Sequence, residues 1–217
     1  PDLQDSSYCS PEQIVAAALA CGDDGLCASF QEPTLLAEWA ADAFVGARDK
    51  GLYCCFVSNG YMTLDALSFL ADHGLDAIKI DVKGDEETYR RHCGSVHSNV
   101  PWRNAEAAKK MGIHVEIVNL LVPGVSDSDS TIATVVREHL RRLGSDTPLH
   151  FTRFVPAYKF HTPATNIQKL EYARETARKA GVKYAYIGNV QGHPYENTFC
   201  PECDERIIAR DGYVILS

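Results

Sequence analysis

A carboxylate follows the first apolar run of the sequence, in the stretch LCASFQEPTLLAEW at residues 26–39. The run from Leu26 to Phe30 is typical of a buried strand, and Glu32 and Pro33 begin the turn after it. Ligands of parallel sheets bind at the carboxyl ends of the strands, so Glu32 is a candidate binding residue. The alternative is that Glu32 opens the next helix, where a negative charge is favoured and Pro33 fits the first turn.

Other apolar runs also end in short turns that carry polar side chains or proline. These turns are SNGY at 58–61, DVKG at 81–84, VPGV at 122–125 and VPAY at 155–158. At one end of a parallel barrel they would place Asn59 and the Asp81/Lys83 pair around one cavity with Glu32. Taken singly, Asn59-Gly60 is an ordinary turn and Asp81 with Lys83 an ordinary ion pair.

The elements that must position these residues recur along the chain. Apolar runs rich in small and β-branched residues occupy 26–30, 53–57, 77–82, 114–122, 149–155 and 183–187, roughly one βα repeat apart. SPEQ at 10–13 predicts a capping box for a helix before the first run. The pattern predicts an α/β fold, either a barrel or an open parallel sheet. Glycines after the helical patterns are predicted as left-handed C-caps, at Gly51, Gly74, Gly112, Gly144 and Gly181.

The composition limits the kind of protein that this chain can be. It has 217 residues, of which 45% are apolar, and we expect one main domain with a sizeable core. A formal net charge of -8 disfavours nucleic acid as a partner. No apolar run is long enough for a membrane span and no secretory signal is recognisable, so we expect a cytoplasmic protein.

The two ends of the chain differ from the regular repeat. Because the first residue is Pro1, we expect a fragment, a processed form or the ordered part of a longer protein. The repeat is lost after Gly188, and the remainder is rich in turn residues. We therefore predict an α/β domain at residues 1–188 and a small appendage at residues 189–217.

Of the eight cysteines, four fall inside apolar runs and two have the spacing of metal ligands. Those inside apolar runs are expected to act as small hydrophobic side chains, because a chain of this size does not need a disulfide scaffold. Cys200 and Cys203, in CPEC, have the spacing of half a tetrahedral zinc site. A redox dithiol is the alternative, but the segment lacks the strand-to-helix setting that activates such thiols.

The order of these motifs resembles that of the radical S-adenosylmethionine (SAM) enzymes close to pyruvate formate-lyase activating enzyme, and most closely the radical enzyme of the AmmeMemoRadiSam system. The resemblance is carried by FQEPTLLAEWAADAF, FVSNGYMT, IKIDVKGDEETYR, LLVPGVSDSDSTI, HFTRFVPAYKF and YIGNVQGHPYENTFCPEC. It implies a partial (β/α)6 barrel of the radical SAM type, like a TIM barrel in part, which lacks its first strand and cluster loop. The appendage would then be half of a zinc ribbon, with zinc as a candidate cofactor.

The resemblance also implies a binding role for Glu32. The segment Gln31-Glu32-Pro33 takes the place of the family's Gly-Gly-Glu-Pro segment, which holds the amino group of the methionine moiety of SAM. Gln31 departs from this pattern, because many relatives have glycine there. The departure changes how the backbone approaches the ligand but leaves the carboxylate in place.

Further cofactor contacts are implied at the next strand ends. Ser58 and Asn59 lie where the second of these strands would contact SAM. Asp81 and Lys83 follow the family's Asp-Leu-Lys pattern, with valine in the middle, and Lys83 would pair with the SAM carboxylate. Asn119 is a weaker candidate for the ribose, since a polar side chain in an apolar run otherwise needs a buried partner.

The chemistry of the family is reductive cleavage of SAM by a 4Fe-4S cluster, which gives methionine and a 5'-deoxyadenosyl radical. Three cysteines spaced CxxxCxxC bind the cluster in that family, and this sequence contains no such triplet. The helix at Ser10 also needs a preceding strand. We therefore expect the cluster loop upstream of the segment Pro1–Tyr8, and we expect these 217 residues alone to be inactive.

Other functions remain open at this point. Lys83 beside Asp81 is a candidate Schiff-base lysine of a barrel aldolase, and a binding scaffold without a cluster is a third possibility. The resemblance implies Memo-type and AMMECR-type protein partners, or activation of a glycyl-radical enzyme, with flavodoxin or ferredoxin as reductant. His150, Arg153, Tyr158, Lys159 and His161 are expected to cluster at a strand end, where they bind an anionic group or a partner or form a solvated rim.

Overall fold

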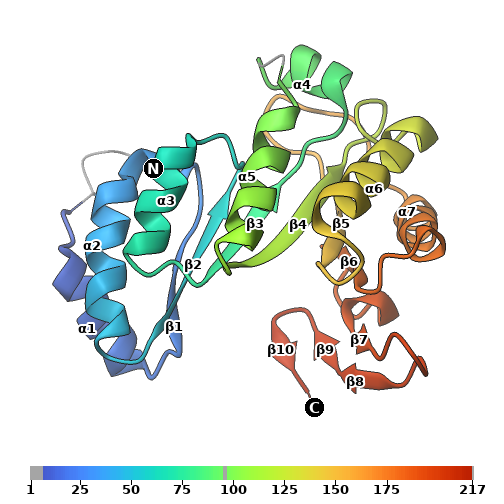
Figure 1. Cartoon of the computed structure of the whole chain (residues 1–217). Helices are drawn as coiled ribbons and strands as arrows, with labels where there is room; N and C mark the ends of the chain where they lie inside the picture. Colours follow the sequence, from blue (N-terminus) through green and yellow to red (C-terminus); the bar gives the residue numbers. More distant parts are fainter. Residues whose placement is uncertain (1–6, 95–96, 217) are drawn as a thin grey trace.

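The computed structural model describes residues 7–94 and 97–216, and its centre is one parallel sheet (Figure 1). Each strand of the sheet pairs in parallel with the next strand along the chain, in the order β1-β2-β3-β4-β5-β6. The observed strands overlap all the predicted runs. The strands are β1 (Gly25–Ala28), β2 (Tyr53–Ser58), β3 (Ala77–Asp81), β4 (His114–Leu121), β5 (Leu149–Arg153) and β6 (Ala185–Gly188).

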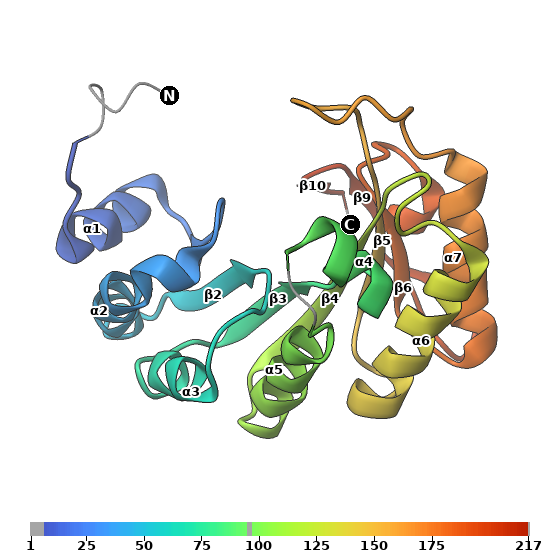
Figure 2. The ribbon, with the colours of Figure 1, turned by 90° about the horizontal axis from the view of Figure 1, so that it is seen from above.

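Helices connect the strands and lie on the outer side of the curved sheet (Figure 2). Short parallel strands require such crossovers, because a tight turn cannot join them. The sheet is curved but not closed, so the fold is a partial α/β barrel, as the sequence predicts. The helices are α1 (Pro11–Cys21), α2 (Ala37–Arg48), α3 (Leu64–Asp72), α4 (Glu86–His92), α5 (Asn99–Lys110), α6 (Asp129–Leu143) and α7 (Ile167–Ala180), with a 3-10 turn η2 (Pro33–Leu36) before α2.

Local sequence signals form the predicted helix ends. The Ser10 side chain accepts a hydrogen bond from the backbone of Gln13, whose side chain in turn accepts one from the Ser10 backbone, which completes the capping box. All five predicted C-cap glycines have positive φ. Gly181 adopts the left-handed helical conformation, whereas Gly144 combines φ 75° with ψ -171° and lies outside that region.

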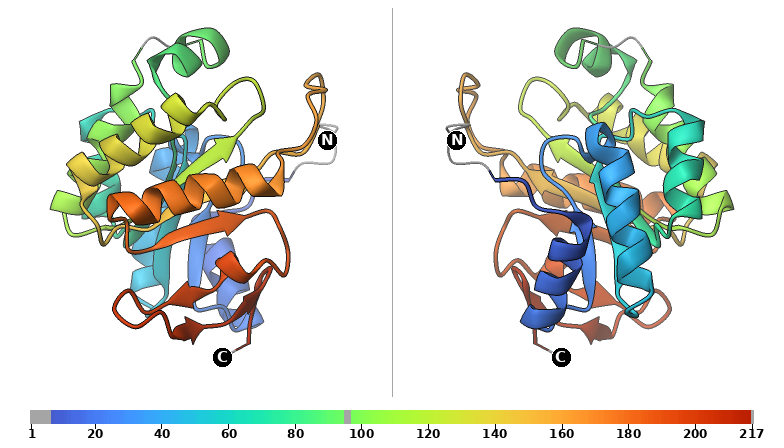
Figure 3. Two further views of the ribbon diagram at one scale, coloured as in Figure 1. Left: turned by 90° about the vertical axis from the view of Figure 1, so that its right-hand side faces the viewer. Right: turned by 90° about the vertical axis from the view of Figure 1, so that its left-hand side faces the viewer.

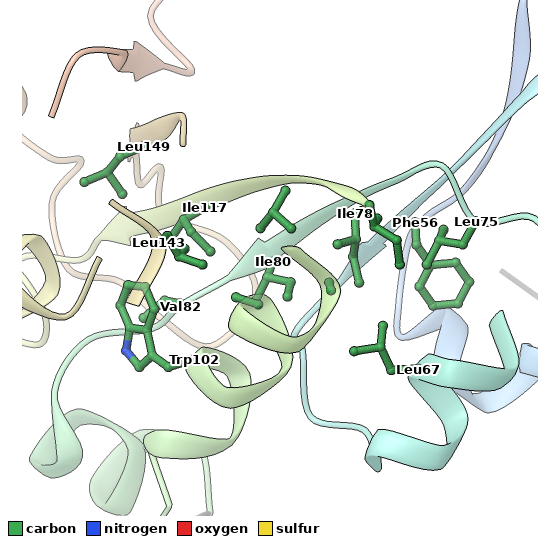
Figure 4. Close-up of a cluster of buried hydrophobic side chains, with 14 of the residues drawn as sticks. Phe56, Leu67, Leu75, Ile78, Ile80, Val82, Trp102, Ile117, Leu143 and Leu149 are labelled. Carbon is green, nitrogen blue, oxygen red and sulfur yellow. The ribbon is translucent and has the colours of Figure 1, made fainter. Parts of the chain in front are cut away.

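The main core lies between the sheet and its helices (Figure 4). Strand residues of one parity face this core, as Val115, Ile117 and Leu121 do in β4. Residues of the other parity, such as Glu116, face the concave side of the sheet. Because side chains alternate along a strand, one face holds the fold together while the other is free to carry polar groups.

After β6 the chain leaves the α/β pattern. The 3-10 turn η3 (Pro194–Glu196) is followed by two small antiparallel pairs (Figure 3). One pair joins β7 (Thr198–Phe199) to β8 (Arg206–Ile208), and the other joins β9 (Arg210–Asp211) to β10 (Val214–Ile215). Among the described residues, none of the helices has the length and apolar character needed to cross a membrane.

The contribution of the core to the free energy of unfolding can be measured at Ile117, which is 0% exposed. Ile117→Ala is expected to lower the free energy of unfolding by about 3 kcal/mol, because it removes buried methyl groups and leaves a cavity. Val45→Ala, on a side chain that is 46% exposed in α2, is the control and should change it by less than about 0.5 kcal/mol. Urea unfolding measures both, and equal effects would contradict this description of the core.

Candidate functional site

The Glu32 carboxylate joins the ends of β1 and β2. Its Oε1 atom accepts hydrogen bonds from the Thr34 backbone N–H at 3.1 Å, the Thr34 hydroxyl at 2.5 Å and the Ser58 hydroxyl at 2.8 Å. Its Oε2 atom accepts one from the Asn59 backbone N–H at 2.8 Å. Glu32 therefore caps the 3-10 turn η2 and also ties this turn to the next strand end. The structure therefore shows the capping role of Glu32, and its role in binding a ligand stays a prediction.

The same carboxylate keeps some capacity to bind a ligand. An ionised carboxylate oxygen has about two acceptor sites. Oε1 is fully used by its three donors, while the described residues give Oε2 the single donor from Asn59. Glu32 is half-buried and is held in one orientation. This arrangement fits the amino group of an amino-acid ligand, which needs a fixed anionic acceptor.

The backbone before Glu32 is strained. Phe30 has φ 64° and Gln31 has φ 51°, which is the left-handed region that favours glycine. A side chain in this region costs about 1–2 kcal/mol per residue. Gln31 therefore adopts a backbone conformation that glycine, which many relatives have at this position, would adopt without this cost. The Phe30 side chain is turned outward and is 89% exposed.

The Asn59 turn is held from behind by α5. Asn59 Oδ1 accepts a hydrogen bond from the Tyr61 N–H at 2.7 Å, which fixes the turn locally. The Nδ2 atom of Asn104, a residue that is 0% exposed, donates to the carbonyls of Gly60 at 2.7 Å and Met62 at 2.8 Å. Asn104 is not among the residues that the sequence predicts for the site. The only sequence signal for Asn104 is a polar residue at a position of a helix that becomes buried when the helix packs against the sheet.

Lys83 and Asp81 lie beside this turn. Lys83 Nζ is 3.2 Å from Asp81 Oδ2, and both side chains are about one-third exposed. Lys83 has three N–H donors, so an ion pair with one carboxylate oxygen leaves donors for a ligand carboxylate. A cavity of about 420 Å³ is lined by Asn59, Tyr61, Lys83, Tyr89, Cys93 and Gly94. The structure thus brings Lys83 to the same cavity as the turn that contacts Glu32.

Asn119 is placed differently from the other candidates. It is 0% exposed and lies on the helix-covered side of β4, with Ile117 and Leu121. Its Nδ2 atom donates to the carbonyl of Val82 at 2.7 Å, and its Oδ1 atom has no hydrogen-bond partner among the described residues. Asn119 therefore supports the strand end between Asp81 and Lys83 from behind, and the structure does not bring its side chain to the cavity.

A second cavity, of about 690 Å³, lies between the concave face of the sheet and the appendage. Glu116 is its anionic centre, with His150 Nε2 at 2.8 Å and His114 Nε2 at 3.2 Å. The His150 ring stacks on Tyr186 at 4.8 Å between ring centroids. The remaining lining residues that can carry charge include Lys79 from β3 and Arg210 and Asp211 from the appendage.

The polar group expected in HFTRFVPAYKFH does not assemble. His150 lies near the start of β5 and contacts Glu116, whereas Arg153 lies at its end and donates from Nε to the Thr165 carbonyl. Tyr158, beyond the strand, is 86% exposed. A single cluster does not form because extended chain separates residues that are close in sequence. Tyr158, Lys159 and His161 are exposed, which fits the alternative of a solvated rim.

The Cys200/Cys203 turn has local features of a metal knuckle. Backbone N–H groups of Glu202 and Cys203 hydrogen-bond to the Cys200 sulfur and lower the pKa of its thiol. Within residues 7–94 and 97–216 no group of three or more His, Cys, Asp or Glu side chains is placed to hold a metal ion. The described residues therefore do not supply the three cysteines of a 4Fe-4S cluster, and the zinc half-site stays a prediction.

The curved parallel sheet of six strands, with helices on its outer side, defines an α/β partial-barrel protein that has a carboxylate and an ammonium group at its strand ends. Residues 4–136 match the model of the Radical SAM superfamily. The chain therefore belongs to the Radical SAM superfamily.

The chain is also similar to individual proteins. An uncharacterized protein of Methanocaldococcus jannaschii is 39% identical over 202 residues, which are 93% of this chain and 60% of the relative. A domain of pyruvate-formate lyase-activating enzyme from Bacteroides vulgatus has a similar structure (TM-score 0.64, 16% identity, 76% of this chain and 99% of that chain). SuiB of Streptococcus suis bound to S-adenosylmethionine is also similar (TM-score 0.67, 11% identity, 92% and 49%). At these identities the two structures support the fold alone.

The close packing behind the Asn59 turn can be tested at Gly60. A Cβ atom on Gly60 would lie 2.7 Å from Ile80 Cγ2 and 3.0 Å from Pro101 Cβ, at φ 71°. Gly124 is the matched control, because its φ is 74° and a Cβ there meets nothing within 4 Å. Gly124→Ala should cost about 1 kcal/mol of stability from backbone strain alone. Gly60→Ala should cost about 1–3 kcal/mol more. Urea midpoints that fall equally would contradict the packing.

The Glu116 cluster predicts a pH dependence of stability. Burial by itself raises the pKa of Glu116, but hydrogen bonds and charge from His150 and His114 outweigh it and lower the pKa from 4.5 to about 2. The lowered pKa stabilises the fold above pH 4.5, and this contribution is lost as the pH falls from 4.5 to about 2.

Glu116→Gln should therefore flatten the fall of the melting temperature in that pH range, by the equivalent of about 1 kcal/mol after allowance for solvent screening. Glu38→Gln, at an exposed position of α2, is the control and should follow the wild-type curve. A Glu116→Gln curve as steep as that of the wild type would show that the two histidines do not stabilise the carboxylate.

Proposed function

We propose that this chain is the SAM-binding part of a radical SAM enzyme similar to pyruvate formate-lyase activating enzyme. The observation that supports this most is the oriented Glu32 carboxylate, which shares the Asn59 turn with the cavity that Lys83 lines. An amino acid has one ammonium and one carboxylate group, and the site offers one acceptor and one donor of the complementary charges. Membership of the superfamily also accounts for the order of motifs, which an aldolase leaves unexplained.

In this proposal the residues of the chain hold the methionine moiety and limit its motion. Glu32 Oε2 accepts a hydrogen bond from the SAM amino group, and Lys83 pairs with the SAM carboxylate. Ser58 acts through Glu32, because its hydroxyl donates to the carboxylate instead of to the ligand. When bound, SAM supplies a sulfonium whose reductive cleavage yields methionine and a 5'-deoxyadenosyl radical.

The 4Fe-4S cluster needs ligands that these residues do not provide. The sequence has no CxxxCxxC, and the loop that we expect to carry it lies next to residues 1–6, which are outside the described residues. The chain spans 60% of the length of its M. jannaschii relative. We therefore assign radical chemistry to a longer protein that contains this chain.

Exposed apolar side chains beside Glu32 suggest that a macromolecule is the substrate or partner. Phe30, Leu35 and Leu36 are 89%, 81% and 63% exposed, and they follow the strand that leads to Glu32. Exposed apolar side chains beside a binding site are typical of protein interaction surfaces. We propose a Memo-type or AMMECR-type partner, or else a glycyl-radical enzyme, with a cytoplasmic flavodoxin or ferredoxin as reductant.

Calorimetric titration with SAM tests the binding site. Lys83→Met should weaken binding about tenfold, because it removes a charge-assisted contact worth about 1.5 kcal/mol or more. Lys50→Met, at an exposed position after α2, is the control and should bind SAM as the wild type does. Glu32→Ala should also weaken binding. If both site variants bind as tightly as the wild type, the placement of SAM is wrong.

Anaerobic reconstitution with iron and sulfide tests the reaction. The longer protein should form 5'-deoxyadenosine on reduction, whereas residues 1–217 alone should form neither this product nor a stoichiometric cluster. A longer protein that forms no cluster and does not cleave SAM would support the alternative of a binding scaffold without a cluster. Borohydride trapping of a substrate on Lys83 would support the aldolase.

A further inference from the structure

Two cysteines face each other across the first two strands of the sheet. Cys27 of β1 and Cys55 of β2 are direct partners in the parallel register, so their side chains point to the same face. This face is the concave one, because Cys54 points the other way: it is 0% exposed and its Sγ atom lies 3.9 Å from the Phe44 carbonyl of α2. Cys27 is exposed and Cys55 is half-buried.

This arrangement differs from the sequence expectation. Cysteines in apolar runs were expected to act as small hydrophobic side chains, and Cys54 does so. Cys27 instead lies in a strand of four residues whose concave side is open to solvent. The run that forms β1 is apolar in sequence. The Cys27 side chain nevertheless points to the concave face of the sheet, which the helices do not cover.

The two sulfur atoms interact with each other. The Cys55 thiol hydrogen-bonds to the Cys27 sulfur, and this contact is the largest cause of a lowered Cys27 pKa. Burial opposes the effect, while Ser29 and the charge of Lys79 add to it, and the Cys27 pKa falls to about 6. The same contact and burial raise the pKa of Cys55. Cys27 is thus the nucleophilic thiol, and Cys55 holds the proton between them.

The backbone allows the two thiols to be joined. Neighbouring strands lie about 4.8 Å apart, and disulfides form between Cα atoms about 4.4–6.8 Å apart. Two thiols in contact, one of them accessible and with a lowered pKa, meet the requirements for thiol–disulfide exchange.

We propose that Cys27 and Cys55 form a redox-reactive dithiol site that low-molecular-weight disulfides, such as oxidised glutathione, convert reversibly to a disulfide. The Cys27 thiolate attacks one sulfur of the small disulfide, and a mixed disulfide forms as one small thiolate leaves. Cys55 then loses its proton and attacks the Cys27 sulfur, which releases the second small thiol. The small disulfide gains two electrons and the cysteine pair loses two.

Such a bond would have a structural effect at the SAM-binding site proposed above. Cys27 precedes Glu32 by one short turn, and Cys55 precedes Ser58 and Asn59 on β2. A covalent link between β1 and β2 would therefore restrain the two strand ends that the Glu32 carboxylate joins. The dithiol chemistry itself does not depend on the proposed function, because it needs neither SAM nor a cluster.

Peptide mapping of the intact protein after exposure to oxidised glutathione tests the site. We expect a peptide linked through Cys27 and Cys55, located by fragmentation, that dithiothreitol reverses. Cys54→Ala should still form the link, whereas Cys55→Ala should leave Cys27 as a mixed disulfide. Before oxidation, iodoacetamide should alkylate Cys27 about tenfold faster at neutral pH than the exposed Cys21, because more of Cys27 is thiolate.

Two results would overturn the proposal. One is wild-type protein in which Cys27 carries glutathione and no Cys27–Cys55 link forms. The other is alkylation of Cys27 at the rate of Cys21 with no change in Cys55→Ala, which would show that the two thiols do not interact. The first readout uses the wild-type protein alone, so it stands even where a cysteine variant fails to fold.

Discussion

Four hydrogen bonds to the Glu32 carboxylate determine how the first two strands of the sheet end. Without this acceptor, the N–H groups of Thr34 and Asn59 and the hydroxyl of Ser58 would need other partners. Leaving a buried donor without a partner costs about 1–3 kcal/mol. The arrangement of these two strand ends therefore depends on polar contacts between segments that are far apart in sequence. The apolar core alone does not determine it.

The two faces of the sheet have different roles: one packs against the helices, and the other carries polar side chains on the concave side. In β3, Ile78 and Ile80 face the helices while Lys79 between them faces the concave side, and β4 repeats this with Ile117 after Glu116. Core packing resists changes of volume, whereas the concave face tolerates exchange of polar groups. Proteins with the same framework can therefore differ in what the concave face holds.

Strands, helix caps and the Glu32, Asn59 and Lys83 positions could be predicted because each has a local signal: an apolar run, a glycine or a turn after a strand. Asn104 and the His150–Glu116 contact could not, because they depend on which residues a tertiary fold brings together. For Asn119, only part of the prediction could be made from the sequence. Its position in the strand was evident, but the face to which it points depends on register.

The order of the strands has a consequence for biosynthesis. Each strand of the sheet pairs with the one made just before it, so the sheet can grow in step with translation. The cavity on the concave face behaves differently, since it is lined by Lys79 and also by Tyr213. At typical rates of translation the ribosome needs on the order of ten seconds to pass from one to the other. The polar side chains of the concave face thus stay uncovered for that interval, until residues 210–214 have been made.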